Sequence, residues 1–130
     1  MRVRFLALAA VCVVFLALPA WAHHSHGNYA MAEFTTLEGT IQEVLLINPH
    51  SWVFLEVEDG SGESAVWALE ATGTRGLERN GIEPEHVVPG DAVSVRCHTL
   101  RDGSKGCLLG FITPMHGDTA RGHGVEVEWD

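Results

Sequence analysis

Five short segments, in which apolar and polar residues alternate, constrain the fold of this chain more than any other feature. They cover residues 36–47, 51–58, 64–70, 92–99 and 106–113. In the second of them Val53, Leu55 and Val57 share one face, as in a half-buried β-strand. Turn sequences such as 59–62 separate the segments, and residues 72–80 have helical spacing that ends at a glycine. The pattern therefore predicts five strands and one short helix.

The order of these elements is three strands, one helix and two strands, which is the order of an OB-type barrel. We therefore predict an all-β domain with one short helix, folded as a small five-stranded OB-like β-barrel over residues 35–114. A generic small β-sandwich or a split barrel is the competing architecture.

The N-terminal residues 1–22 have the three parts of a secretory signal peptide. Arg2 and Arg4 precede the apolar run 5–18, and Ala-Trp-Ala at 20–22 is a cleavage sequence. The apolar run is short for a transmembrane helix, and no second one follows it. We therefore expect a periplasmic protein with an N-terminal arm at 23–34 and a flexible, glycine-rich C-terminal tail at 115–130.

The chain is acidic, with 17 aspartates and glutamates against 8 lysines and arginines, a net charge of −9. This charge repels nucleic-acid backbones and anionic lipids, and it favours cations or basic partners. The sequence contains no nucleophile elbow, phosphate loop, dinucleotide fingerprint or His-Glu-x-x-His motif. We therefore expect a binding protein rather than an enzyme.

Signal cleavage after residue 22 would expose His23 and His24 beside a free terminal amine. An amine and neutral imidazoles are ligands for copper(II) and zinc. The alternative is a polar terminus that binds metal only adventitiously. The sequence thus predicts a metal site that begins at the mature terminus.

Two further histidines lie in or next to the loops that form the ligand face of an OB-type barrel. His50 follows Asn48-Pro49 between the first two predicted strands, and His98 ends the fourth. We therefore predict that His23, His24, His50 and His98 bind copper or zinc together. For each of these two histidines a role without metal is the alternative. His50 can cap a backbone group, and His98 can be an incidental surface residue.

Asn48 and Trp52 flank His50 and are the predicted contacts for an organic ligand. Trp52 lies on the face opposite the aliphatic residues of its strand, where an indole can stack on a sugar or another ring. Packing of Trp52 against Tyr29 and Phe34 in the arm is the equal alternative.

Cys97 and Cys107 remain after the signal peptide, which carries Cys12, is removed. They occupy apparent core faces nearly opposite each other across the last hairpin. A cross-strand disulfide is therefore predicted for an oxidising compartment. Two buried free thiols are the alternative.

The ordered landmarks of the chain resemble an uncharacterised family of small exported bacterial proteins, a domain of unknown function. They are Ala22-His23-His24-Ser25, Leu37-Glu38-Gly39-Thr40, Asn48-Pro49-His50 with Trp52, Trp67 with Glu70, Pro89-Gly90-Asp91, and His98 before Arg101-Asp102-Gly103. The resemblance covers most of residues 22–113 and implies a periplasmic β-barrel, not an activity. The chain departs from the family pattern at His26, Ile82 and Thr99.

We therefore expect a periplasmic protein that binds copper or zinc, with an affinity that falls as the pH drops through about 6.5. The alternatives are a metal-independent module for a small organic or saccharide ligand and a module that binds a protein partner through its acidic surface.

Overall fold

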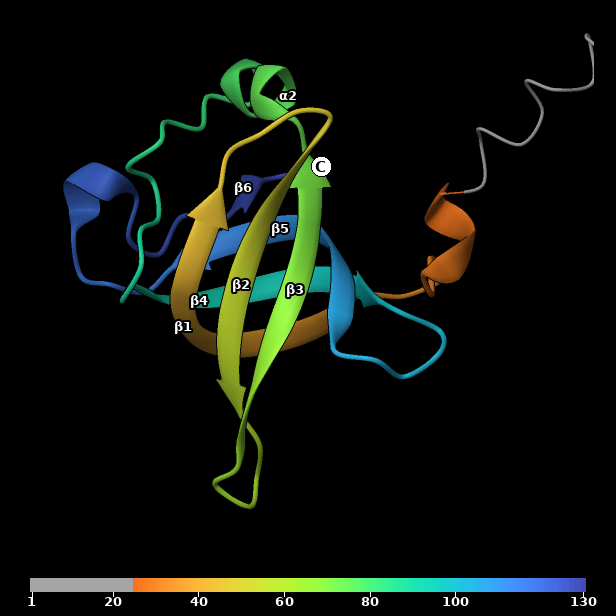
Figure 1. Ribbon diagram of the computed structural model, residues 1–130. Helices are drawn as coiled ribbons and strands as arrows, with labels where there is room; N and C mark the ends of the chain where they lie inside the picture. The colour runs from red at the N-terminus through yellow and green to blue at the C-terminus, as the bar shows by residue number, and fades with distance from the viewer. Residues whose placement is uncertain (1–24) are drawn as a thin grey trace, which may run out of the picture.

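The computed structural model describes residues 25–130, which form a strand-rich domain (Figure 1). Its elements in chain order are η2 (Ser25–Asn28), β1 (Thr35–Leu45), β2 (His50–Glu58), β3 (Ser64–Thr72), α2 (Thr74–Arg79), β4 (Ala92–Thr99), β5 (Gly106–Pro114), η3 (Thr119–Arg121) and β6 (Val127–Glu128). No helix within residues 25–130 is long and apolar enough to cross a membrane.

The first five strands close into a barrel. The sheet order is β3-β2-β1-β4-β5-β6, and a parallel pairing of β3 with β5 joins the two sides. That pairing aligns Ala68 with Gly106 and Glu70 with Leu108. Because α2 lies between β3 and β4, the arrangement is that of an OB-type barrel and confirms the predicted fold class.

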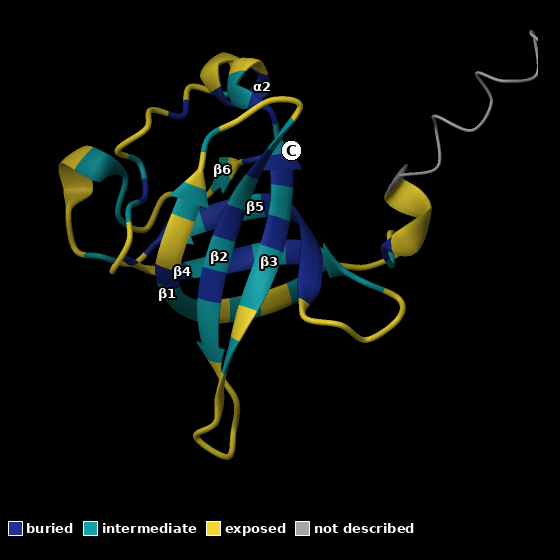
Figure 2. Ribbon diagram, viewed as in Figure 1, coloured by how far each residue is buried: buried dark blue, intermediate teal, exposed yellow. Residues whose placement is uncertain are grey.

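The barrel interior is filled by the apolar faces of all five strands. Figure 2 shows buried and partly buried residues alternating along the strands and exposed residues at the turns. Val53, Leu55 and Leu69 have no exposed surface, and Leu77 and Ile82 close one end from α2 and the segment after it. The three residues predicted to share one face of β2, Val53, Leu55 and Val57, thus face the core.

A β-bulge in β1 changes which of its residues face the core. The pairing with β2 shifts between Ile41 and Glu43, so that Val44 packs against the core and Leu45 is exposed. Strict alternation along 36–47 would place Leu45 and Ile47 on the face of Ile41. That expectation from the sequence is wrong, because one extra residue in the bulge reverses the alternation.

Cys97 and Cys107 form the predicted disulfide. Both residues are fully buried, and their Cα atoms lie 5.7 Å apart across the β4–β5 hairpin. The pairing register is offset by a bulge at Arg96, which brings the two cysteines to neighbouring positions inside the barrel.

The C-terminal segment is folded onto the barrel, in contrast to the flexible tail predicted for 115–130. Trp129 is 1 % exposed and its backbone spans the gap between two strands: its N–H donates to Gly110 O, and its carbonyl accepts from the Thr72 N–H. The Asn80 amide donates to the carbonyls of Glu128 and Asp130. Burial of the indole and pairing of these backbone groups hold the segment.

Asp91 fastens the turn before β4 to the C-terminal segment. Its carboxylate accepts hydrogen bonds from the Val88 N–H and from the guanidinium of Arg121. Burial alone would raise the pKa of Asp91, but the hydrogen bonds from Arg121 and Val88 and the positive charge of Arg121 hold this pKa below its usual range.

The stability that Asp91 provides should therefore be present at neutral pH and lost in acid. Asp91→Asn is expected to lower the free energy of unfolding by about 1.5–3 kcal/mol at pH 7. Because the folded pKa lies below the unfolded value of about 3.9, this difference should shrink as the pH falls through the folded pKa. Urea unfolding at pH 7 and pH 2.5 measures it, with exposed Glu38→Gln as the control. A difference that stays constant with pH would contradict the role given to this carboxylate.

Candidate functional site

His50 is held on the outer face of the barrel by a carboxylate. It begins β2, and Glu70 lies on the neighbouring strand β3, where it pairs in register with Trp52. The Nδ1 atom of His50 lies 2.9 Å from Oε1 of Glu70, and the His50 side chain is 41 % exposed. Because a carboxylate has only acceptor atoms, this contact favours the tautomer that carries its proton on Nδ1 and its lone pair on Nε2. This pairing of a histidine with a carboxylate is the arrangement that orients metal-binding histidines in many proteins.

Tyr29 joins the N-terminal arm to this pair. Its hydroxyl donates a hydrogen bond to Oε2, the second carboxylate oxygen of Glu70. Burial, the hydrogen bond to Glu70 and the negative charge of Glu70 all raise the pKa of Tyr29. The phenol therefore stays protonated and remains a donor throughout the physiological range.

The backbone of the arm is fixed beside the end of β4. Tyr29 forms an antiparallel bridge with Leu100, and the Ala30 N–H donates to Thr99 O at 2.9 Å. The Arg101 N–H donates to Asn28 O at 2.9 Å, and the Arg101 side chain donates to Tyr29 O. The chain just after the N-terminal histidines is thus tied to the barrel next to Glu70 and His50.

His98 lies in a different group of side chains. Its ring stacks on Phe34 with 4.1 Å between the ring centroids, and its Nδ1 lies 2.7 Å from Glu33 O. Arg96 sits over the rings of Phe34 and Phe111 and forms an ion pair with Glu126. This group covers the outer faces of β4 and β5.

The structure does not bring His50 and His98 together. In register, His98 pairs with Leu108, Leu108 with Glu70, and Glu70 with Trp52. Two strands, β5 and β3, therefore separate His98 from β2, a path of about 14 Å along the sheet. Because outward side chains of a closed barrel diverge, this spacing does not support the predicted convergence of the two loop histidines.

In this structure the Asn48 side chain stabilises the fold through two hydrogen bonds to Thr74. Its amide donates to Thr74 Oγ1 at 2.8 Å, and its carbonyl oxygen accepts from the Thr74 N–H at 3.0 Å. These two bonds fasten the β1–β2 loop to the first turn of α2 and use the amide that the sequence prediction assigned to a ligand. The loop that carries His50 is consequently anchored at its base.

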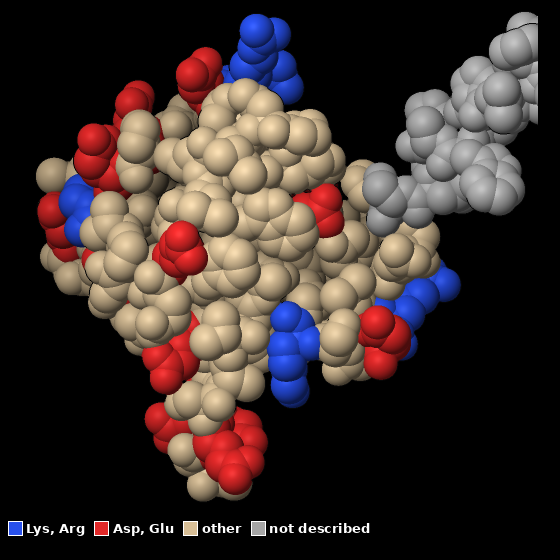
Figure 3. Space-filling view, in the orientation of Figure 1, with Lys and Arg blue, Asp and Glu red and all other residues tan. Residues whose placement is uncertain are grey.

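Trp52 lies half-buried on the outer face of β2, beside Glu70 in the pairing register. Figure 3 shows few charged side chains over the middle of β2 and β3, and acidic groups near the ends of this face. Trp52 thus lies next to the His50–Glu70 pair, and its contact with an organic ligand stays a prediction.

The two remaining predicted ligands, His23 and His24, lie outside the described residues. Within residues 25–130 no three histidine, cysteine, aspartate or glutamate side chains are grouped so as to hold a metal ion. A metal ion on His50 would therefore need further ligands from beyond this part of the chain.

Glu70 and Tyr29 are the two members of the site that sequence reasoning did not assign to it. Glu70 lies on the outer side of its strand, since its neighbours Leu69 and Ala71 are buried. That alternation is visible in the sequence, but only the β2–β3 register shows that Glu70 faces His50.

The fold and the site define a small OB-type β-barrel protein whose outer face carries a carboxylate-held histidine. The chain belongs to the family of unknown function DUF6152, whose model matches residues 10–109. This match confirms the family resemblance seen in the sequence. No curated protein and no solved structure matches the chain significantly.

Proposed function

We propose that this protein is an exported binding protein, not an enzyme, that holds copper(II) or zinc with His50 as its anchoring ligand. The terminal amine, His23 and His24 would complete the site after signal cleavage. The observation that carries the proposal is the 2.9 Å contact between His50 Nδ1 and Glu70 Oε1, because a carboxylate beside Nδ1 favours the tautomer whose lone pair is on Nε2 and orients the ring.

The position of the arm supports the same assignment. Tyr29 contacts the carboxylate that holds His50, and the two N-terminal histidines precede Tyr29 closely in the sequence. A chain tied down at Tyr29 has a small volume to search, so its histidines meet His50 at a high effective concentration. The acidic charge of the protein adds a general attraction for cations.

Metal titration of the exported protein tests this proposal. The protein is purified from the periplasm of an expression host, its terminus is checked by sequencing, and bound metal is removed with a chelator. Calorimetry with copper(II) and with zinc should show one saturable site. His50→Ala should abolish that site, and Glu70→Gln should weaken it about 10–100-fold, as loss of an outer-shell carboxylate does.

His98→Ala is the matched control, because it also removes one outward-facing imidazole from the end of a strand. It should leave the affinity unchanged. Equal losses in His50→Ala and His98→Ala, or the absence of saturable binding in the unmodified protein, would overturn the proposal.

A further inference from the structure

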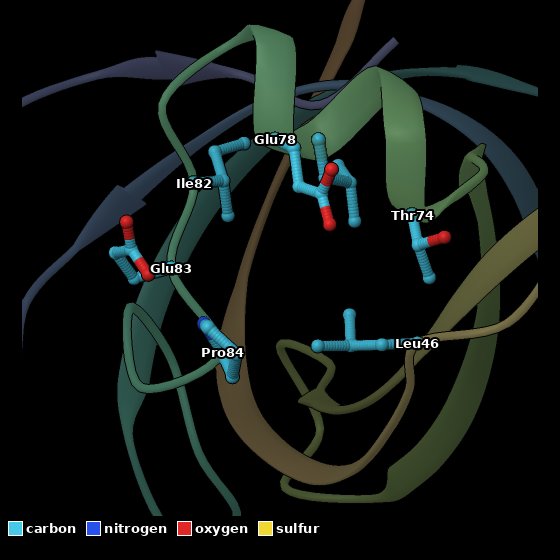
Figure 4. Close-up of a pocket in the computed structure, with 7 residues that line it drawn as sticks. Leu46, Thr74, Glu78, Ile82, Glu83 and Pro84 are labelled. Carbon is cyan, nitrogen blue, oxygen red and sulfur yellow. The ribbon is translucent and has the colours of Figure 1, made fainter.

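A cavity of about 390 Å³ opens at the end of the barrel that α2 covers (Figure 4). It is bounded by the loop after β1, by α2 and by the segment that follows α2. The residues that line it are Leu46, Thr74, Leu77, Glu78, Ile82, Glu83 and Pro84. Its volume is within the range of about 300–1,000 Å³ that is typical of small-molecule sites.

The walls of this cavity are apolar and well supported. Leu77 is 3 % exposed and Ile82 is 6 % exposed, and both belong to the main core. Leu46 packs against that core from the opposite side, and the Asn48–Thr74 hydrogen bonds join the two walls. A ligand would thus meet a preformed apolar surface.

Two carboxylates stand at this apolar cavity, one from α2 and one from the segment after it. In Figure 4 the Glu78 side chain points from α2 toward the space above Leu46, and Glu83 borders the opposite wall. Neither carboxylate forms an ion pair with any residue in 25–130. An apolar ligand that covered the two carboxylates would remove them from water. This removal costs free energy unless the ligand carries a positive charge.

We infer that this cavity binds a small amphipathic amine, whose apolar body packs on Leu46, Leu77 and Ile82 and whose ammonium group lies between Glu78 and Glu83. The apolar wall selects the body of the ligand, and the two carboxylates select its charge. This site shares no residue with the His50 site, so it stands whether or not the protein binds metal.

Three probes with the same alkyl chain test the inference: octylammonium, octanol and octanoate. Each is titrated into metal-free exported protein, in chelator, and followed by calorimetry and by the methyl NMR signals of Leu77 and Ile82. Octylammonium should bind saturably and shift both signals. It should bind at least about tenfold more tightly than octanol, because the two carboxylates attract its charge, and octanoate should not bind.

Glu78→Gln combined with Glu83→Gln should remove the preference for octylammonium over octanol. Glu58→Gln combined with Glu63→Gln removes two carboxylates at the distant β2–β3 turn and should leave that preference intact. Leu46→Trp fills the cavity and should block octylammonium, whereas Ile47→Trp, at an exposed neighbour, should not. Circular dichroism confirms that each variant is folded, and Leu46→Ala, which removes part of the wall, should weaken both octylammonium and octanol.

Equal affinity for octylammonium and octanol in the unmodified protein would overturn the inference, and so would the absence of binding by all three probes. Self-association in the absence of a probe, abolished by Leu46→Trp, would overturn it as well, because it would assign the cavity to a second copy of the chain.

Discussion

Replacing Trp129 with alanine is expected to lower the free energy of unfolding by about 3–5 kcal/mol, the range for loss of a buried aromatic side chain. Trp129 is almost fully buried among core residues, and its backbone connects Gly110 on β5 to Thr72 on β3. The side chain therefore seals the part of the barrel where the parallel pairing of β3 and β5 has ended.

Urea unfolding followed by far-UV circular dichroism measures this loss without relying on tryptophan fluorescence. Glu128→Ala is the control, because its side chain is exposed and should change stability by less than about 0.5 kcal/mol. A loss below about 1 kcal/mol for Trp129→Ala would mean that the C-terminal segment is the flexible tail that its composition indicates.

Removing the disulfide should have the second-largest effect on stability. Cys97 and Cys107 are separated by 10 residues in the sequence, and both are fully buried. Cross-linking a loop of this length restricts the unfolded chain by about 3 kcal/mol in the loop-entropy description. Cys97→Ala combined with Cys107→Ala should therefore lower the free energy of unfolding by about that amount.

The measurement compares urea unfolding of the unmodified protein and the double variant, each with and without dithiothreitol. Reductant should destabilise the unmodified protein and leave the double variant unchanged. Two titratable thiols in the unfolded, unreduced protein would show that the cysteines are free and would contradict this prediction.

The fold was predictable because its signals are local. Alternation in β2 and the turn at 59–62 indicate a strand and its end without knowledge of any partner. The bulge in β1 was not predictable in the same way, because an extra residue is defined only against the strand opposite. Leu45 and Ile47 look like core residues in the sequence and become exposed once that pairing is known.

The candidate site was only half predictable, for the same physical reason. His50 is marked by the rigid Asn48-Pro49 sequence before it, but its contact with Glu70 depends on strand register, and the contact of Tyr29 with Glu70 depends on the path of the arm. His98 also lies near a ligand-face loop, at the end of β4, yet β5 and β3 separate it from His50 once the barrel closes.

The glycine-rich composition of the C-terminal segment did not predict that this segment folds onto the barrel. Gly117, Gly122 and Gly124 suggest flexibility, and all three adopt positive φ in the structure, where glycine permits tight turns. Those turns return the chain to the gap between β3 and β5, which only the closed barrel defines. Burial of the Trp129 indole and the backbone hydrogen bonds of Trp129 then hold the end in place.

The location of a bound zinc ion tests the central claim most directly. Crystals of the exported protein grown with one equivalent of zinc, with data collected at the zinc absorption edge, would show the ion as an anomalous-difference peak. We expect that peak about 2.0–2.1 Å from Nε2 of His50, with Nδ1 still in contact with Glu70 and with nitrogen ligands from His23 or His24. A peak at His98 instead, or full occupancy with Nε2 of His50 unligated, would contradict the proposed site.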